Sequence, residues 1–84
     1  MRARHRRTLR ALFASPTSGT IRWADIEALI GALGGQVEER AGSRVAMRLN
    51  GVRAVFHRPH PKPETDKGAV RSLRRFLTEA GISP

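Results

Sequence analysis

The chain of 84 residues contains no cysteine, which excludes a disulfide framework, a thiolate metal site and a cysteine nucleophile. It has no run of about 18 apolar residues, so no segment is predicted to span a bilayer. Its charged start lacks the apolar stretch of a secretory signal. It also lacks a phosphate-binding loop, a dinucleotide fingerprint and a convincing metal-ligand spacing. We therefore expect a cytoplasmic protein without a metal ion or a small-molecule cofactor.

Acidic residues and aromatic residues are both scarce. Seven Asp and Glu stand against 16 Lys and Arg, which gives a formal net charge of +9, and 14 of the basic residues are arginines. A guanidinium group stays charged and binds phosphate as a planar fork. The charge therefore favours a nucleic acid as partner, with an anionic membrane or a merely solvated surface as alternatives. Aromatic residues make up 5% of the chain, so base stacking is not expected to dominate binding.

The first 20 residues form a basic segment, predicted to hold a helix over residues 3–14 followed by a linker. Leu9 and Leu12 lie at helical spacing among arginines. The helix is expected to end before Pro16, because proline disfavours a helical conformation in the residue before it. A disordered arm that binds nucleic acid is the alternative for this segment.

A second helix is predicted over residues 22–33, where apolar residues recur every three or four positions. Thr20 is expected to cap its start, and Gly34 to end it, because glycine accepts the left-handed conformation found after helices. Trp23 lies on the apolar stripe of this helix, and we expect it in the core rather than stacked on a base.

Three strands are predicted over residues 36–40, 44–49 and 52–57. The last two alternate apolar and polar residues and are joined by Asn50-Gly51, which is the strongest short signal for a hairpin with a type I′ turn. This turn fixes the register, because a shift of one residue would exchange the two faces. One face is then apolar and is made of the pairs Leu49–Val52, Met47–Ala54 and Val45–Phe56.

The other face of the hairpin is predicted to be basic. The register pairs Arg48 with Arg53 and Arg44 with His57. Two arginines directly opposite each other repel, and a bound polyanion or a neighbouring carboxylate would relieve that repulsion. We therefore predict that Arg44, Arg48 and Arg53 contact the phosphates of a nucleic acid.

A proline-rich connector over residues 58–64 is predicted to lead into a final helix. The helix is expected to start near Thr65-Asp66 and to end at Gly81. Its basic side chains are further candidates for phosphate contacts: Lys67, Arg71, Arg74 and Arg75. The order of elements predicts an α+β fold, in which helices cover one face of a three-stranded antiparallel sheet.

Five motifs between about Trp23 and Ile82 occur in the same order as in a known family: IEALIGALGGQV at residues 26–37, Gly42-Ser43 before an alternating strand, His60-Pro61, KGAVRSL at residues 67–73, and Ala80-Gly81-Ile82. Together they resemble the HicA family of bacterial toxins, whose closing segment has a Lys-Gly-Thr-Leu-Arg pattern that leads to Ala-Gly-Ile.

The resemblance implies an α-β-β-β-α fold like that of double-stranded-RNA-binding domains, here with an extra N-terminal helix. Residues 1–20 are then a basic helix and linker, and residues 21–84 a HicA-like RNA-binding domain. It also implies a metal-independent ribonuclease that cleaves mRNA and is held inactive by a HicB-type antitoxin. The net charge predicts that such an antitoxin is acidic.

The chain departs from the family at one position that matters for catalysis. The family's activating histidine follows Gly-Ser, and here that position is Arg44, which cannot act as a base near neutral pH. Imidazole is suited to proton transfer in RNA cleavage. We therefore take His57, across from Arg44, and His60, in the connector, as the candidate catalytic residues.

Two other functions remain open at this point. The first is an RNA-binding module of the same fold that has lost catalysis, which the arginine at position 44 favours. The second is a protein that works only by docking an acidic partner.

Overall fold

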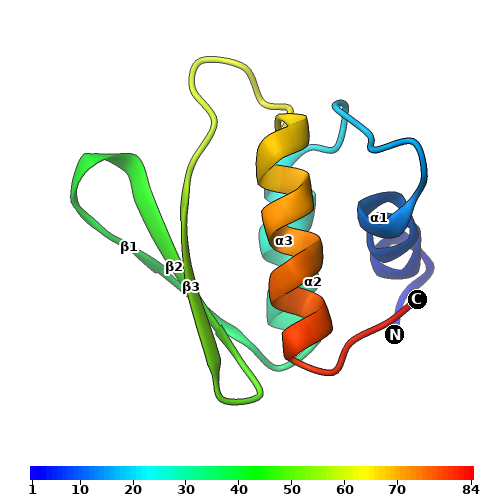
Figure 1. Cartoon of the computed structure of the whole chain (residues 1–84). Helices are drawn as coiled ribbons and strands as arrows, with labels where there is room; N and C mark the ends of the chain where they lie inside the picture. Colours follow the sequence, from blue (N-terminus) through cyan, green and yellow to red (C-terminus); the bar gives the residue numbers. More distant parts are fainter.

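The computed structural model describes residues 1–84, and its elements lie in three layers (Figure 1). The sheet forms one layer, α2 (Trp23–Ala32) and α3 (Lys67–Glu79) form the middle one, and α1 (Ala3–Phe13) lies outermost. α2 contacts β1, α3 contacts β3, and α1 contacts both helices of the middle layer. The sheet consists of β1 (Gln36–Glu39), β2 (Arg44–Leu49) and β3 (Val52–His57). The predicted α+β fold, with helices on one face of an antiparallel sheet, is confirmed.

The β2–β3 hairpin has the predicted register. Arg48 pairs with Arg53, and Arg44 pairs with His57. The backbone of the turn has positive φ at both central residues, 50° at Asn50 and 82° at Gly51, as a type I′ turn requires. The pairs Leu49–Val52, Met47–Ala54 and Val45–Phe56 therefore face the helices, and the arginines face away from them together with the Ala46–Val55 pair.

The N-terminal ends of α2 and α3 are capped in different ways. Thr20 was expected to cap α2, but this prediction is wrong: the N-cap residue is Arg22, and no side chain caps the helix. The connector takes this role instead, since the N–H of Trp23 donates to the carbonyl of Pro63 at 3.0 Å. In α3, the carboxylate of Asp66 accepts from the N–H of Ala69 at 2.7 Å, which is an ordinary side-chain cap.

One apolar core fills the space between the layers. Its 16 buried residues come from all three helices, β2, β3 and the segment before α2. Leu9 and Leu12 belong to this cluster, so α1 shares the core of the other elements. Trp23 is buried, as predicted, with its ring edge-on to that of Phe56 at 6.3 Å between centroids. None of the helices is long and apolar enough to cross a membrane.

Two glycines near the end of α2 give a matched test of this packing. A Cβ at residue 35 would lie 2.7 Å from the carbonyl oxygen of Arg48 and 2.8 Å from a methyl carbon of Ile30. We expect Gly35→Ala to destabilise the fold by about 1–3 kcal/mol, because neither neighbour is free to move away. Gly31 lies inside the helix with open space around it, and Gly31→Ala should stabilise the fold by about 0.5–1 kcal/mol.

Urea denaturation of both variants measures this difference directly. Equal midpoints for Gly35→Ala and the unchanged protein would show that the backbone at Gly35 does not lie against Arg48 and Ile30.

Candidate nucleic-acid interface

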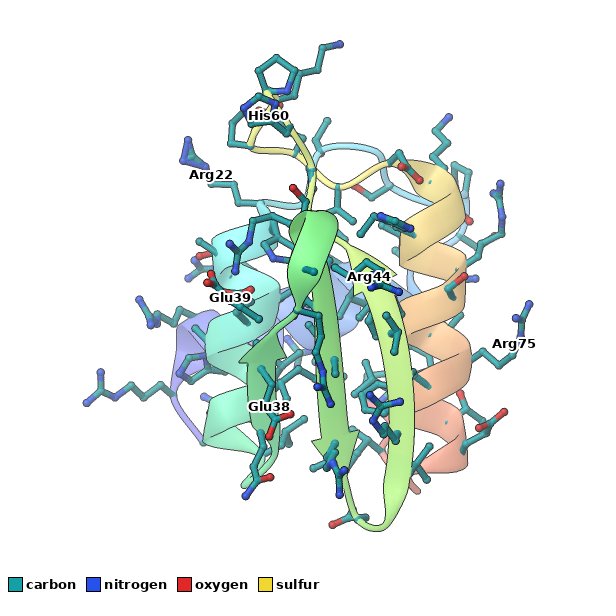
Figure 2. All side chains as sticks on the ribbon, turned by 90° about the vertical axis from the view of Figure 1, so that its left-hand side faces the viewer. Arg22, Glu38, Glu39, Arg44, His60 and Arg75 are labelled. Carbon is teal, nitrogen blue, oxygen red and sulfur yellow. The ribbon has the colours of Figure 1, made fainter.

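The outer face of the sheet carries the arginines predicted from the sequence. Arg44, Arg48 and Arg53 are all exposed. Figure 2 shows Arg44 on the side of the sheet that no helix covers, and the register puts Arg48 and Arg53 on the same side. The β2–β3 pairing brings them together, since Arg48 is directly opposite Arg53 and Arg44 begins the same strand as Arg48. Val55, next to them on this face, is also exposed. The hairpin thus presents three guanidinium groups on one surface.

These three arginines have no acidic partner. The ion pairs of the structure join Arg40 to Glu38 at 3.5 Å, and Arg58 to both Glu27 and Glu39. The Nε of Arg44 donates to the carbonyl of Ala41 at 3.0 Å, which orients its guanidinium without neutralising it. No carboxylate forms an ion pair with the cross-strand pair of arginines, because Glu38, which lies beside Ala46 on the same face, is paired with Arg40 instead.

Two shallow pockets lie on this face and share one residue. The first, about 310 Å³, is lined by both arginines of the cross-strand pair and by the Asn50-Gly51 turn. The second, about 410 Å³, is lined by Arg40, Ala41, Arg44, Arg53 and Val55. Arg53 lines both pockets. The two pockets are therefore adjacent along the hairpin. Their charged lining residues are all arginines, whose guanidinium groups can bind phosphate.

The two candidate catalytic histidines line a third pocket, beyond the end of the sheet. This pocket, about 420 Å³, is lined by His57, by most of the connector, including His60, Lys62 and Glu64, and by Asp66 at the start of α3. His57 ends β3 and is paired with Arg44; the Cβ atoms of such a pair are about 5 Å apart. His60 lies at the top of the connector (Figure 2). No three His, Asp or Glu side chains are grouped to hold a metal ion.

Arg58, the residue after His57, forms two ion pairs that the sequence did not predict. Its guanidinium donates to Glu39 at 2.6 Å and to Glu27 at 3.2 Å. The carboxylates of Glu39 and then Glu27 raise the pKa of Arg58 above its usual value. Glu27 also accepts from the indole N–H of Trp23 at 2.8 Å. This cluster ties the end of β3 to α2 and β1, and so positions the start of the histidine pocket.

The basic residues of α3 do not share the sheet face. Lys67, Arg71 and Arg75 are exposed, and Arg75 points outward from the helix (Figure 2). Arg74 has another role: its Nε donates to the carbonyl of Leu12 at 2.8 Å, and its terminal nitrogen donates to that of Ala14 at 3.2 Å. These bonds satisfy carbonyls at the end of α1. Arg74 thus links α3 to the end of α1.

A family model described as HicA toxin of bacterial toxin-antitoxin matches residues 23–82. The match begins with α2 and ends just after α3. It therefore leaves α1 and its linker outside. No curated protein and no solved structure gives a significant match.

Proposed function

The chain belongs to the HicA family of toxins from bacterial toxin–antitoxin systems, and from this premise we propose that it binds mRNA through the outer face of its sheet. Contacts with phosphates position the RNA on Arg44, Arg48 and Arg53. Lys67, Arg71 and Arg75 extend the basic surface along α3 for a longer RNA. The toxin is proposed to act in the cytoplasm, with residues 21–84 as its RNA-binding part.

The unpartnered pair of Arg48 and Arg53 is the observation that supports this proposal most strongly. The two residues face each other across the hairpin, and no carboxylate reaches either of them. Like charges in this position destabilise a sheet by about 0.2–1 kcal/mol. An RNA strand along the hairpin supplies the missing negative charge, and the shape of a phosphate matches the planar guanidinium fork.

We further propose that the toxin cleaves the bound RNA without a metal ion. Such cleavage requires a base for the 2′-hydroxyl proton, an acid for the leaving oxygen and a cation beside the phosphate. Arg44 supplies the cation, because a guanidinium remains charged. His57, paired with it across the strands, is proposed to move the first proton, and His60, in the same pocket, the second.

The variant H57Q/H60Q tests this assignment. We expect it to lose RNA cleavage by a factor of about 10²–10⁴, the usual contribution of proton transfer by a positioned side chain, while it still binds RNA. K62Q is the matched control, since it changes a residue of the same pocket that is not assigned to proton transfer. Cleavage of a labelled RNA by purified protein is the measurement, and unchanged cleavage in H57Q/H60Q would remove both histidines from the mechanism.

A module that binds RNA without cleaving it is the second candidate function. The observation that favours it is Arg44, which stands where the family's activating histidine is expected. In that case RNA binding would depend steeply on salt, and the bound RNA would stay intact even with the unchanged protein.

A HicB-type antitoxin is proposed as the protein partner. The toxin carries a net charge of +9, so an acidic antitoxin that covers the sheet face would neutralise the arginines and exclude RNA. If the toxin functions only by docking an acidic partner, it should bind no RNA even at low salt.

A further inference from the structure

We infer that the outer side of α1 is a second RNA-binding surface, directed at the phosphate backbone and separate from the sheet face. The inference rests on the proposed function in one respect, since it takes RNA to be the ligand. It concerns a helix that lies outside the residues matched by the family model.

The first argument is the charge of this segment. Residues 1–24 contain six arginines and no aspartate or glutamate. Arg4, Arg7 and Arg10 are exposed, and none of them belongs to an ion pair. Residues three apart lie on neighbouring turns of one side of a helix. α1 therefore presents a row of positive charges that form no ion pair, with Asp25 of α2 as the one carboxylate in a pocket beside Arg7.

The second argument is that α1 is held rigidly. Leu9 and Leu12 are buried in the core, and Arg74 donates from α3 to carbonyls at the end of α1. Because the inner side of the helix is fixed by packing, its outer side points in a constant direction. A preorganised row of arginines loses less conformational entropy on binding than a disordered basic arm would.

The third argument is the position of α1 in the fold. It lies on the opposite side of the α2–α3 layer from the sheet (Figure 1). The molecule measures 31 × 27 × 21 Å along its principal axes. A short RNA bound to the sheet cannot reach α1 through the body of the protein, so the two surfaces can hold two RNA segments at once.

RNA fits this surface better than a membrane or a protein does. An interfacial helix inserts an exposed apolar side into lipid, but the apolar side of α1 is buried, and Met1 at the chain end is the one large exposed hydrophobic residue near it. The centre of a protein interface is usually apolar or aromatic. A phosphate backbone requires only positive charge, which is what the outer side of α1 offers.

Two variants with equal charge separate the two surfaces. R4Q/R7Q/R10Q changes α1, and R44Q/R48Q/R53Q changes the sheet; each lowers the formal net charge from +9 to +6. Glutamine has nearly the helix propensity of arginine, so α1 keeps its structure. The probe is a short single-stranded RNA of mixed sequence, labelled with a donor dye in one batch and an acceptor dye in another.

We expect the unchanged protein to bind two such RNAs and to give energy transfer between the dyes. R4Q/R7Q/R10Q should bind one RNA and give no transfer, and the RNA that remains on the sheet should keep its dependence on salt, because its phosphate contacts are unchanged. A single RNA bound by the unchanged protein, or two RNAs bound by R4Q/R7Q/R10Q, would overturn the inference.

The outcomes also distinguish this inference from the proposed function. If R44Q/R48Q/R53Q still binds two RNAs and R4Q/R7Q/R10Q binds one, the proposed function of the sheet face fails and the inference about α1 holds. If R4Q/R7Q/R10Q binds RNA like the unchanged protein but loses its antitoxin, α1 is a protein-docking surface and the inference is wrong.

Discussion

The variant R44Q/R48Q/R53Q is expected to lose toxicity and RNA cleavage altogether. The three side chains provide the unpartnered charges on the sheet face, and Arg44 is the cation proposed to stand beside the reacting phosphate. Without them the RNA is no longer held next to His57. Growth of cells that express the variant without an antitoxin, together with cleavage of a labelled RNA by the purified protein, measures the loss.

The same variant should be at least as stable as the unchanged protein. Replacing Arg48 and Arg53 removes a like-charged cross-strand pair, and the gain is expected to be about 0.2–1 kcal/mol. Loss of function together with retained stability would assign these arginines to binding rather than to folding.

The variant R4Q/R7Q/R10Q is the control for charge. It removes the same number of positive charges from α1, on the opposite side of the α2–α3 layer from the sheet, and should still cleave a short RNA that occupies the sheet face alone. If both variants lose cleavage of this short RNA equally, net charge rather than the sheet face determines activity.

The second large effect is expected in α1. Leu12 is completely buried and belongs to the core cluster. We expect Leu12→Ala to destabilise the protein by about 2–5 kcal/mol, because the truncation removes buried apolar contacts and leaves a cavity. Small domains have a total stability of about 5–15 kcal/mol, so this single change should lower the urea midpoint strongly.

Arg10→Ala is the matched control for this prediction. It lies on the exposed side of the same helix, and a change there should stay within about 0.5 kcal/mol. The comparison also tests the predicted division of the chain after residue 20. If Leu12→Ala is as stable as Arg10→Ala, α1 is an appended arm, and residues 21–84 form the folding unit by themselves.

The hairpin shows which parts of the fold local sequence can predict. The Asn50-Gly51 turn requires positive φ at two successive residues, so few backbone conformations are open to it. Strict alternation in the flanking strands then leaves one register that buries the apolar residues. The strand bounds, the pairing and the position of Arg44, Arg48 and Arg53 on one face follow from these two constraints.

Other features depend on contacts that the sequence does not reveal. Arg74 is predicted from the sequence only as a candidate phosphate contact, and the structure shows that it donates to carbonyls at the end of α1, more than 55 positions earlier in the chain. The Arg58 cluster joins α2, β1 and the end of β3. Thr20 fits a capping pattern, yet the connector satisfies the start of α2 instead. Each of these contacts depends on how distant elements pack.

The most direct test of the account is to map bound RNA on the protein by amide chemical shifts. A short single-stranded RNA, added at low salt to the unchanged protein, should shift the signals of β2 and β3 from Arg44 to His57. These shifts should disappear in R44Q/R48Q/R53Q. If RNA leaves the signals of the hairpin unchanged, the sheet face does not bind RNA, and the proposed function is contradicted.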